Sequence, residues 1–126
     1  MNGEESGRVM IVEDEAMVAL GLEMLLESWG YDVVGIVASG QEAVETAEQE
    51  HPSVALVDIT LDGIMDGVAV AEVLRERLDV GSIFISGSRD PKTLARAEAT
   101  HPLAFLGKPF DPAELHEVLR QAGVGE

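Results

Sequence analysis

Five short apolar runs, spread along the chain, constrain its fold more than any other feature of the sequence. They cover residues 9–12, 33–37, 54–57, 83–85 and 103–106, and only Gly35 interrupts the second run. None of them alternates with polar residues. Unbroken apolar runs are typical of strands buried on both faces, as in a parallel sheet with helices on each side. The runs therefore predict a sheet of five parallel strands.

The segment after the first run has the apolar spacing of a helix. Val18, Leu22, Leu25 and Trp29 repeat at steps of four, three and four residues, and Gly30 follows as a C-terminal stop signal. Residues at these spacings lie on one face of an α-helix. The segment is therefore expected to pack one apolar stripe against the sheet.

The segments after the other four runs begin with helix N-cap signals. Ser39 and Glu42 form the pattern of a capping box, and a third helix is expected from about Asp66. Asp90-Pro91 and Asp111-Pro112 each place proline directly after an N-cap residue, at the first helical position. A strand followed by a helix thus repeats five times, which predicts an α/β layered domain.

The chain has 126 residues, 46% of them hydrophobic, which is enough for one core. We expect one domain at 8–122, with 1–7 and 123–126 as short flexible tails. The last helix should end near Gln121, and we expect no room for an output domain after it.

Composition excludes several kinds of site. The chain has no cysteine, which excludes disulfides, thiol catalysis and thiolate metal sites. Its formal net charge of −16 opposes binding to nucleic acid and to anionic membranes. No apolar run approaches the ~18 residues of a membrane span, and residues 1–7 are too acidic for a secretion signal. We therefore expect a cytoplasmic protein, and any metal should be a hard ion bound by oxygen.

The histidines are too scattered for a zinc site; two of them are interpreted as structural, and His116 as a solvated or partly buried side chain. His51 and His101 each precede a proline, a position at which extended backbone is favoured. His116 lies on the last predicted helix.

Polar and charged residues gather where four of the predicted strands end. Ligands bind beyond the carboxyl ends of the strands in open parallel sheets, so these residues form the candidate site. They are Glu13 and Asp14 after the first strand, Asp58 after the third, Ser86 after the fourth and Lys108 after the fifth. Three carboxylates, a hydroxyl and an ammonium are thus expected to converge at one edge of the sheet.

Carboxylates packed this closely require a cation. At an effective dielectric constant of ~20, each close pair of ionised carboxylates costs on the order of several kcal/mol. Mg²⁺ fits because it prefers oxygen ligands and keeps several waters beside one or two carboxylates. The ordinary alternative is that acids at strand ends are solvated loop residues or helix caps, and we adopt it for Glu15. For the whole set, this alternative would require that chemically matched groups stand at four strand ends by coincidence.

Several short motifs connect these residues with a known family. They are Val12-Glu13-Asp14-Glu15, Leu56-Val57-Asp58-Ile59, Met65-Asp66-Gly67, Ser86-Gly87 and Lys108-Pro109-Phe110. In this order they make the chain resemble response-regulator receiver domains of two-component signalling, of the chemotaxis-regulator type, over nearly its whole length. The resemblance implies a flavodoxin-like, doubly wound fold with strand order 2-1-3-4-5 and five helices.

The resemblance also implies roles for the site residues. Asp58 would accept a phosphoryl group from a partner histidine kinase or histidine phosphotransfer protein. Lys108 would pair with Asp58 before the reaction and with a phosphoryl oxygen after it, and Ser86 would donate its hydroxyl to another phosphoryl oxygen. Such transfer depends mainly on positioning and charge neutralisation, so these groups and a metal are sufficient. The chain would assist its own phosphorylation without being an enzyme.

For the metal, the resemblance implies that Asp14 and Asp58 bind Mg²⁺ directly and that Glu13 binds it through water. The backbone carbonyl of Thr60 would complete the share of ligands that the protein provides. Lys108-Pro109 would be a cis peptide that directs the lysine side chain inward.

A signalling face is also implied, with Ser86 and Phe105 as the switch residues. It comprises the helix from Asp90, the strand at 103–106 and the helix from Asp111, and it would contact a protein target or a second copy of the chain. Arg89, Lys92 and Arg96 could make this face attractive to an acidic partner, or they could be ordinary exposed residues of a helix.

Two features depart from the commonest pattern of the family. Phe105 stands where tyrosine is usual, so this side chain has no hydroxyl to donate. The segment 61–65 places Asp66-Gly67 one residue farther from Asp58 than in the chemotaxis-regulator type, so that loop should differ.

Three other functions compete with this one. An Mg²⁺-dependent phosphatase that forms an aspartyl phosphate needs an acid two residues after the nucleophile, and Thr60 stands there. A flavin-binding protein needs a phosphate loop after the first strand, where Glu13-Asp14-Glu15 would repel phosphate. A receiver-like binding module that works without phosphorylation stays open, although the complete set of acids, Ser86 and Lys108 argues against it.

Overall fold

The structure, a computed structural model, describes residues 7–61 and 65–124. In this part of the chain five strands form one parallel sheet in the order β2-β1-β3-β4-β5. The strands are β1 (Arg8–Val12), β2 (Asp32–Val37), β3 (Val54–Asp58), β4 (Gly81–Ser86) and β5 (Ala104–Gly107). The helices are α1 (Ala16–Ser28), α2 (Gly40–Glu50), α3 (Gly67–Leu78), α4 (Pro91–Ala99) and α5 (Pro112–Gln121). The expected flavodoxin-like fold, its strand order and its five helices are confirmed.

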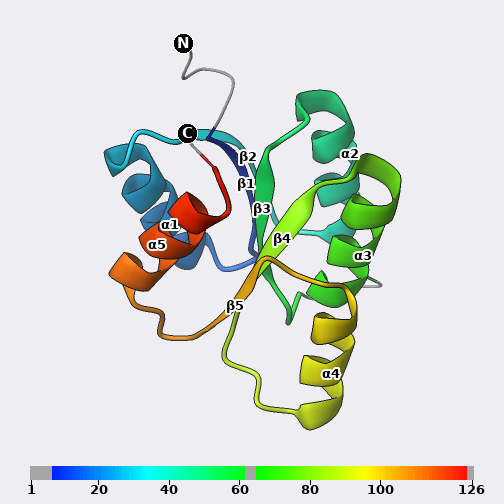
Figure 1. Cartoon of the computed structure of the whole chain (residues 1–126). Coiled ribbons are helices and arrows are strands. Elements are labelled where there is room, and N and C mark those ends of the chain that lie inside the picture. Colours follow the sequence, from blue (N-terminus) through cyan, green and yellow to red (C-terminus); the bar gives the residue numbers. More distant parts are fainter. Residues whose placement is uncertain (1–6, 62–64, 125–126) are drawn as a thin grey trace.

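The helices cover both faces of the sheet. Figure 1 shows α1 and α5 on one face and α2, α3 and α4 on the other. Successive residues of a strand point to opposite faces, so neighbours on β1 enter different cores. Met10 packs with Leu74 in the core under α2, α3 and α4, and Ile11 packs with Leu26 in the core under α1 and α5.

Central and edge strands differ in burial. Every residue of β3 and β4 is buried, and so is β1 from Val9 onward. The edge strands β2 and β5 are partly exposed, with Ile36 at 41% and Phe105 at 37%. The expectation that all five apolar runs are buried on both faces is wrong for these two strands. An edge strand has a neighbouring strand on one side only, which leaves its side chains more open to solvent.

Four helices begin at the N-cap residues expected from the sequence. The side chains of Ser39, Asp66, Asp90 and Asp111 each accept a hydrogen bond from a backbone N–H of the first turn. These bonds satisfy donors that a helix N-terminus otherwise leaves free. In residues 7–61 and 65–124, no helix combines the length and the hydropathy that a bilayer crossing requires.

The buried stripe of α1 differs from the expected one. Of the four predicted positions only Leu22 is fully buried, and the other three are partly buried. Ala19 and Leu26 take their place. The small side chain of Ala19 can face the sheet at close range, which a pattern of large apolar residues does not reveal.

The packed domain extends past the expected boundary at 122. Val124 is 6% exposed, its N–H donates to the Leu119 carbonyl at 3.0 Å, and its own carbonyl accepts from the Tyr31 hydroxyl at 3.2 Å. The expectation of a flexible tail from 123 onward is therefore wrong for Val124, which belongs to the core under α1 and α5. Residues 1–6 and 125–126 of the expected tails, and 62–64 of the loop expected to differ, lie outside the described residues.

The two histidines that precede proline are not extended. His51 and His101 have φ values of +50° and +54°. His51 directly follows α2, and its N–H donates to the Ala47 carbonyl at 2.9 Å, so the end of the helix determines its backbone. For the residue before it, proline disfavours mainly the right-handed helical region. A left-handed backbone also avoids that region.

Candidate functional site

Three carboxylates meet at the carboxyl ends of β1 and β3. Glu13 and Asp14 directly follow β1, and Asp58 is the last residue of β3. One oxygen from each lies within 4.8 Å of the other two. Glu13 and Asp58 are each 4% exposed, and Asp14 is half-buried. The expected convergence of the three acids is therefore present.

Lys108 places its ammonium among these acids from the loop after β5. Its Nζ lies 3.2 Å from Glu13 Oε1, 3.6 Å from Asp58 Oδ2 and 3.7 Å from Glu15 Oε1. The Lys108–Pro109 peptide is cis, as the resemblance implied. Glu15 stays exposed, as expected, but it also contributes to the field around the ammonium.

The local charges explain how these groups titrate. Burial raises the pKa of the Glu13 carboxyl above its ordinary value, and hydrogen bonds from the Glu15 N–H and from Lys108 offset this rise only in part. Burial alone would lower the pKa of Lys108, but the charges of Asp58, Glu13 and Glu15 outweigh it and raise this pKa. One ammonium thus faces several carboxylates, so the site retains excess negative charge. An all-oxygen cluster of this kind fits Mg²⁺.

Thr60 holds the Asp58 carboxylate in one orientation. Its backbone N–H and its hydroxyl both donate to Asp58 Oδ1, each at 3.1 Å, while Oδ2 faces Lys108. The two oxygens of Asp58 are therefore chemically different. Sequence reasoning expected only the carbonyl of Thr60 in the site and missed its hydroxyl. A threonine two residues after an aspartate is a local signal for such a bond.

Ser86 ends β4 beside the loop that carries Lys108. It is 2% exposed, its Oγ accepts from the Ser88 N–H at 3.0 Å, and its carbonyl accepts from the Lys108 N–H at 3.0 Å. A pocket of about 290 Å³ opens next to it, lined also by Leu94 of α4 and Phe105 of β5. The structure thus places Ser86, Lys108 and the aromatic residue Phe105 around one pocket.

Gly67 allows α3 to begin directly against the Asp58 segment. A Cβ at this position would lie 2.1 Å from the Asp58 carbonyl oxygen, so a side chain cannot be accommodated. The Gly67 N–H donates to the Ile59 carbonyl at 2.9 Å. Gly67 belongs to the Met65-Asp66-Gly67 motif, and the close backbone approach requires a glycine at this position.

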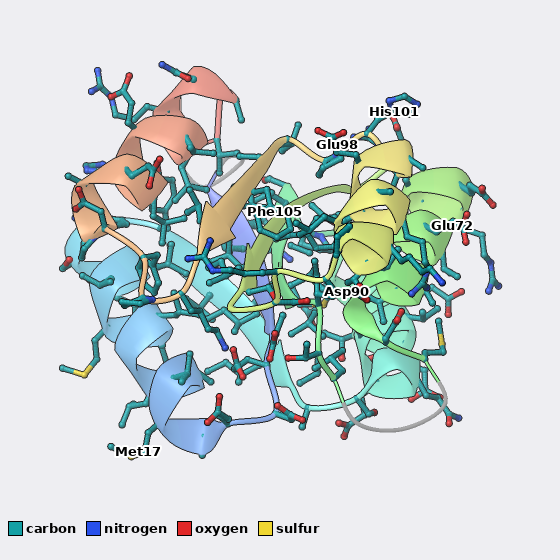
Figure 2. The ribbon with its side chains drawn as sticks, turned by 90° about the horizontal axis from the view of Figure 1, so that it is seen from below. Met17, Glu72, Asp90, Glu98, His101 and Phe105 are labelled. Carbon is teal, nitrogen blue, oxygen red and sulfur yellow. The ribbon has the colours of Figure 1, made fainter. Side chains whose placement is uncertain are left out.

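Phe105 lies on the edge strand β5, on the side of α4 (Figure 2). Its ring centroid is 6.2 Å from that of Phe84, with the planes tilted by 54°. Phe105 is 37% exposed, and it also lines the pocket beside Ser86.

The basic residues near α4 do not form one free patch. Arg89 and Lys92 are exposed, but the guanidinium of Arg96 is bound to the carboxylate of Asp66 at 3.0 Å. The reading of all three as a surface for an acidic partner therefore applies at most to Arg89 and Lys92.

Comparisons with known proteins agree with this geometry. Residues 9–120 match the family model described as the response regulator receiver domain. The chain is 34% identical over 115 residues to the phyllosphere-induced regulator PhyR of Methylorubrum extorquens, covering 90% of this chain and 42% of PhyR. It is 30% identical over 115 residues to the chemotaxis protein CheY of Thermotoga maritima, covering 90% of this chain and 95% of CheY. The chain spans about half the length of several other curated relatives.

Solved structures show the same likeness. The signal receiver domain of a modulated diguanylate cyclase from Desulfovibrio desulfuricans superimposes with a TM-score of 0.88 at 42% sequence identity, covering 91% of each chain. The acidic cluster, Ser86 and Lys108 therefore lie in a fold shared with other signalling proteins.

Proposed function

Because this chain belongs to the response regulator receiver domains, we propose that it is a phosphorylation-dependent switch of two-component signalling whose phosphoacceptor is Asp58. The observation that carries the proposal is the contact of the Asp58 carboxylate with the Lys108 ammonium inside the acidic cluster. A carboxylate that is oriented by Thr60 and faces an ammonium is well arranged to attack phosphorus.

The reaction proceeds by transfer from a phosphohistidine. Asp58 Oδ2, which faces Lys108, attacks the phosphorus, and the P–N bond breaks as the P–O bond forms. The imidazole leaves with the electron pair of the P–N bond. Lys108 then pairs with a phosphoryl oxygen, and the Ser86 hydroxyl donates to another. No general base is needed because the attacking carboxylate is already ionised.

The metal in this proposal is Mg²⁺, which Asp14, Asp58 and the Thr60 carbonyl would hold directly and Glu13 would hold through water. When bound, it neutralises charge on the phosphoryl oxygens. The all-oxygen cluster supports a cation at this place, because one oxygen from each of its three carboxylates lies within 4.8 Å of the other two. Asp14→Asn should reduce the rise in melting temperature that Mg²⁺ produces in the parent.

The phosphodonor is a histidine kinase or a histidine phosphotransfer protein, the partners with which receiver domains generally interact. An apolar surface next to the acids supports docking of such a partner. Met17 and Met24 of α1 are 79% and 63% exposed, and Figure 2 shows Met17 at the outer side of α1. A pocket of about 340 Å³ connects Asp14 with Leu20 and Ile36. A donor bound there would bring its phosphohistidine to the open side of the site.

The receiver assists its own phosphorylation and loss of phosphate, and we do not propose that it turns over a separate substrate. Its output face is α4, β5 and α5, through which it would contact a protein target or a second copy of itself. The competing function is a receiver-like module that binds a partner without phosphorylation.

One experiment separates the two functions. The protein is incubated with acetyl phosphate and Mg²⁺, and its intact mass is measured. We expect a gain of one phosphoryl group, abolished by EDTA and by Asp58→Asn, which replaces the nucleophile with an amide. A parent protein that gains no mass under any of these conditions would contradict phosphorylation at Asp58 and favour the phosphorylation-independent module. Labelling of Asp58→Asn would show that another residue is the acceptor.

A further inference from the structure

α4 is attached to the domain by few buried residues. Of its nine residues only Ala97 is buried, whereas α3 buries five of its twelve. Figure 2 shows α4 lying along α3, with Glu98 of α4, Asp90 at its N-cap and Glu72 of α3 at the surface of the pair. Because apolar burial contributes little to holding α4, individual polar contacts matter more for its position.

The polar contact that joins α4 to α3 has two bonds. Arg96 Nη1 lies 3.0 Å from Asp66 Oδ2, and Arg96 Nη2 donates to Asp66 Oδ1 at 3.4 Å. Such paired bonds between guanidinium and carboxylate restrict geometry more than a lysine contact does. Burial alone would raise the pKa of Asp66, but the hydrogen bonds from Arg96 and from the Ala69 N–H lower it overall, so the pair is ionised at neutral pH.

Asp66 is in turn connected to the phosphoacceptor segment. Its carboxylate caps α3 by accepting from the Ala69 N–H at 2.9 Å. The next residue, Gly67, packs against the Asp58 carbonyl and bonds to Ile59. One end of the ion pair therefore belongs to the well-packed segment around the site, and the other end belongs to the weakly buried α4.

We propose that the Asp66–Arg96 ion pair is a latch that holds α4 in its resting position and thereby lowers the affinity of the site for a phosphoryl group. The proposal rests on the proposed function, since it describes how that site is regulated. A contact made only in the resting arrangement stabilises that arrangement by some factor. It must lower the affinity for any ligand that favours another arrangement by the same factor. For an ion pair at this exposure, we expect the affinity to be lowered by a factor of about two to five.

The test uses hydrogen exchange of α4 amides and the affinity for beryllofluoride, a phosphoryl mimic. In Arg96→Gln, the amides of α4 should exchange about two to five times faster than in the parent without any ligand, and beryllofluoride should bind more tightly by a similar factor. Lys92→Gln is the matched control, because it removes the same charge one turn away on the same helix and should change neither quantity.

A second variant tests the pair itself. Asp66→Asn keeps an oxygen for the Ala69 N–H but removes the charge that Arg96 binds. It should reproduce Arg96→Gln, and the double variant should exchange no faster than either single variant, because the shared interaction is already lost.

The outcomes separate the latch from the proposed function. Equal α4 exchange in Arg96→Gln and Lys92→Gln would overturn the latch. Faster exchange with unchanged beryllofluoride affinity would also overturn it, since the pair would then hold α4 without opposing the switch. If the parent itself does not bind beryllofluoride, the proposed function fails, and the exchange of unliganded α4 alone decides whether the ion pair restrains this helix.

Discussion

The carboxyl ends of β1 and β3 lie at the centre of the sheet, the α4–β5 region lies at its edge beyond β4, and the two regions are held very differently. Asp58 ends β3 and Glu13 directly follows β1, two central strands whose residues are almost all buried, and the Lys108 ammonium contacts both carboxylates. α4 buries one residue, and β5 buries only Leu106. The difference teaches that groups that need fixed geometry belong on central strands, whereas a region that must shift is found among weakly packed elements.

The largest effect should come from two phenylalanines that touch each other across this boundary. Phe84 is fully buried on β4, and Phe105 is partly exposed on β5. Phe84→Ala should lower the free energy of unfolding by about 3–5 kcal/mol, because it leaves a cavity in the core. Phe105→Ala should cost about 1 kcal/mol. Urea unfolding of both variants measures the contrast, and equal losses would contradict the division into two regions.

A second effect concerns the cation that neutralises the acids. Lys108→Met should lower the free energy of unfolding at neutral pH without Mg²⁺ by about 1–3 kcal/mol, because Glu13 and Asp58 remain buried without their ammonium. Mg²⁺ should restore more stability in this variant than in the parent. Lys92→Met, on exposed α4, is the control and should be near neutral. If both variants unfold at the same urea concentration without Mg²⁺, Lys108 does not neutralise the cluster.

A third effect concerns the connection between the two regions. Ser86→Ala should still accept phosphate at Asp58, but the loss of one bond to a charged oxygen should weaken beryllofluoride binding by roughly 1.5 kcal/mol. Amide chemical shifts in α4 and β5 should respond less to beryllofluoride. Ser86→Thr keeps a hydroxyl and should behave more like the parent. Shifts of equal size in Ser86→Ala and the parent would mean that the signal takes another route.

The smallest effect is a dependence of stability on pH. The folded state raises the pKa of Glu13 above its ordinary value of 4.5, so the folded protein binds this proton more tightly than the unfolded chain does. Without Mg²⁺, the contribution of Glu13 is therefore fully present below pH 4.5 and is lost as the pH rises through the raised pKa. Unfolding midpoints of the parent should fall across this range more steeply than those of Glu13→Gln. Parallel curves would show that Glu13 carries no such shift.

Much of the architecture followed from local patterns. Apolar runs located all five strands to within about two residues, and N-cap residues located the starts of four helices, because both signals depend on neighbours in sequence. The acids, Ser86 and Lys108 could be placed together because the carboxyl ends of parallel strands lie at one edge. Their individual roles in phosphoryl transfer remain predictions.

Other features depended on contacts that no local pattern contains. On α1, Val18, Leu25 and Trp29 are only partly buried, whereas Ala19 and Leu26, which lie outside the predicted stripe, are buried. Edge exposure of β2 and β5 follows from strand order and not from their own residues. Val124 joins the core because its carbonyl and its N–H form hydrogen bonds with Tyr31 and Leu119.

The sequence by itself determined the alternation of strands and helices and the identity of the acidic, hydroxyl and ammonium groups at the strand ends. Hydrophobic spacing and capping act over a few residues, so they can be read locally. Only the tertiary structure decided that position 67 has no room for a side chain beside the Asp58 carbonyl. It also decided that Arg96 binds Asp66, thirty residues away in the chain. Both depend on the distance between packed segments, and that distance exists only once the two cores have formed.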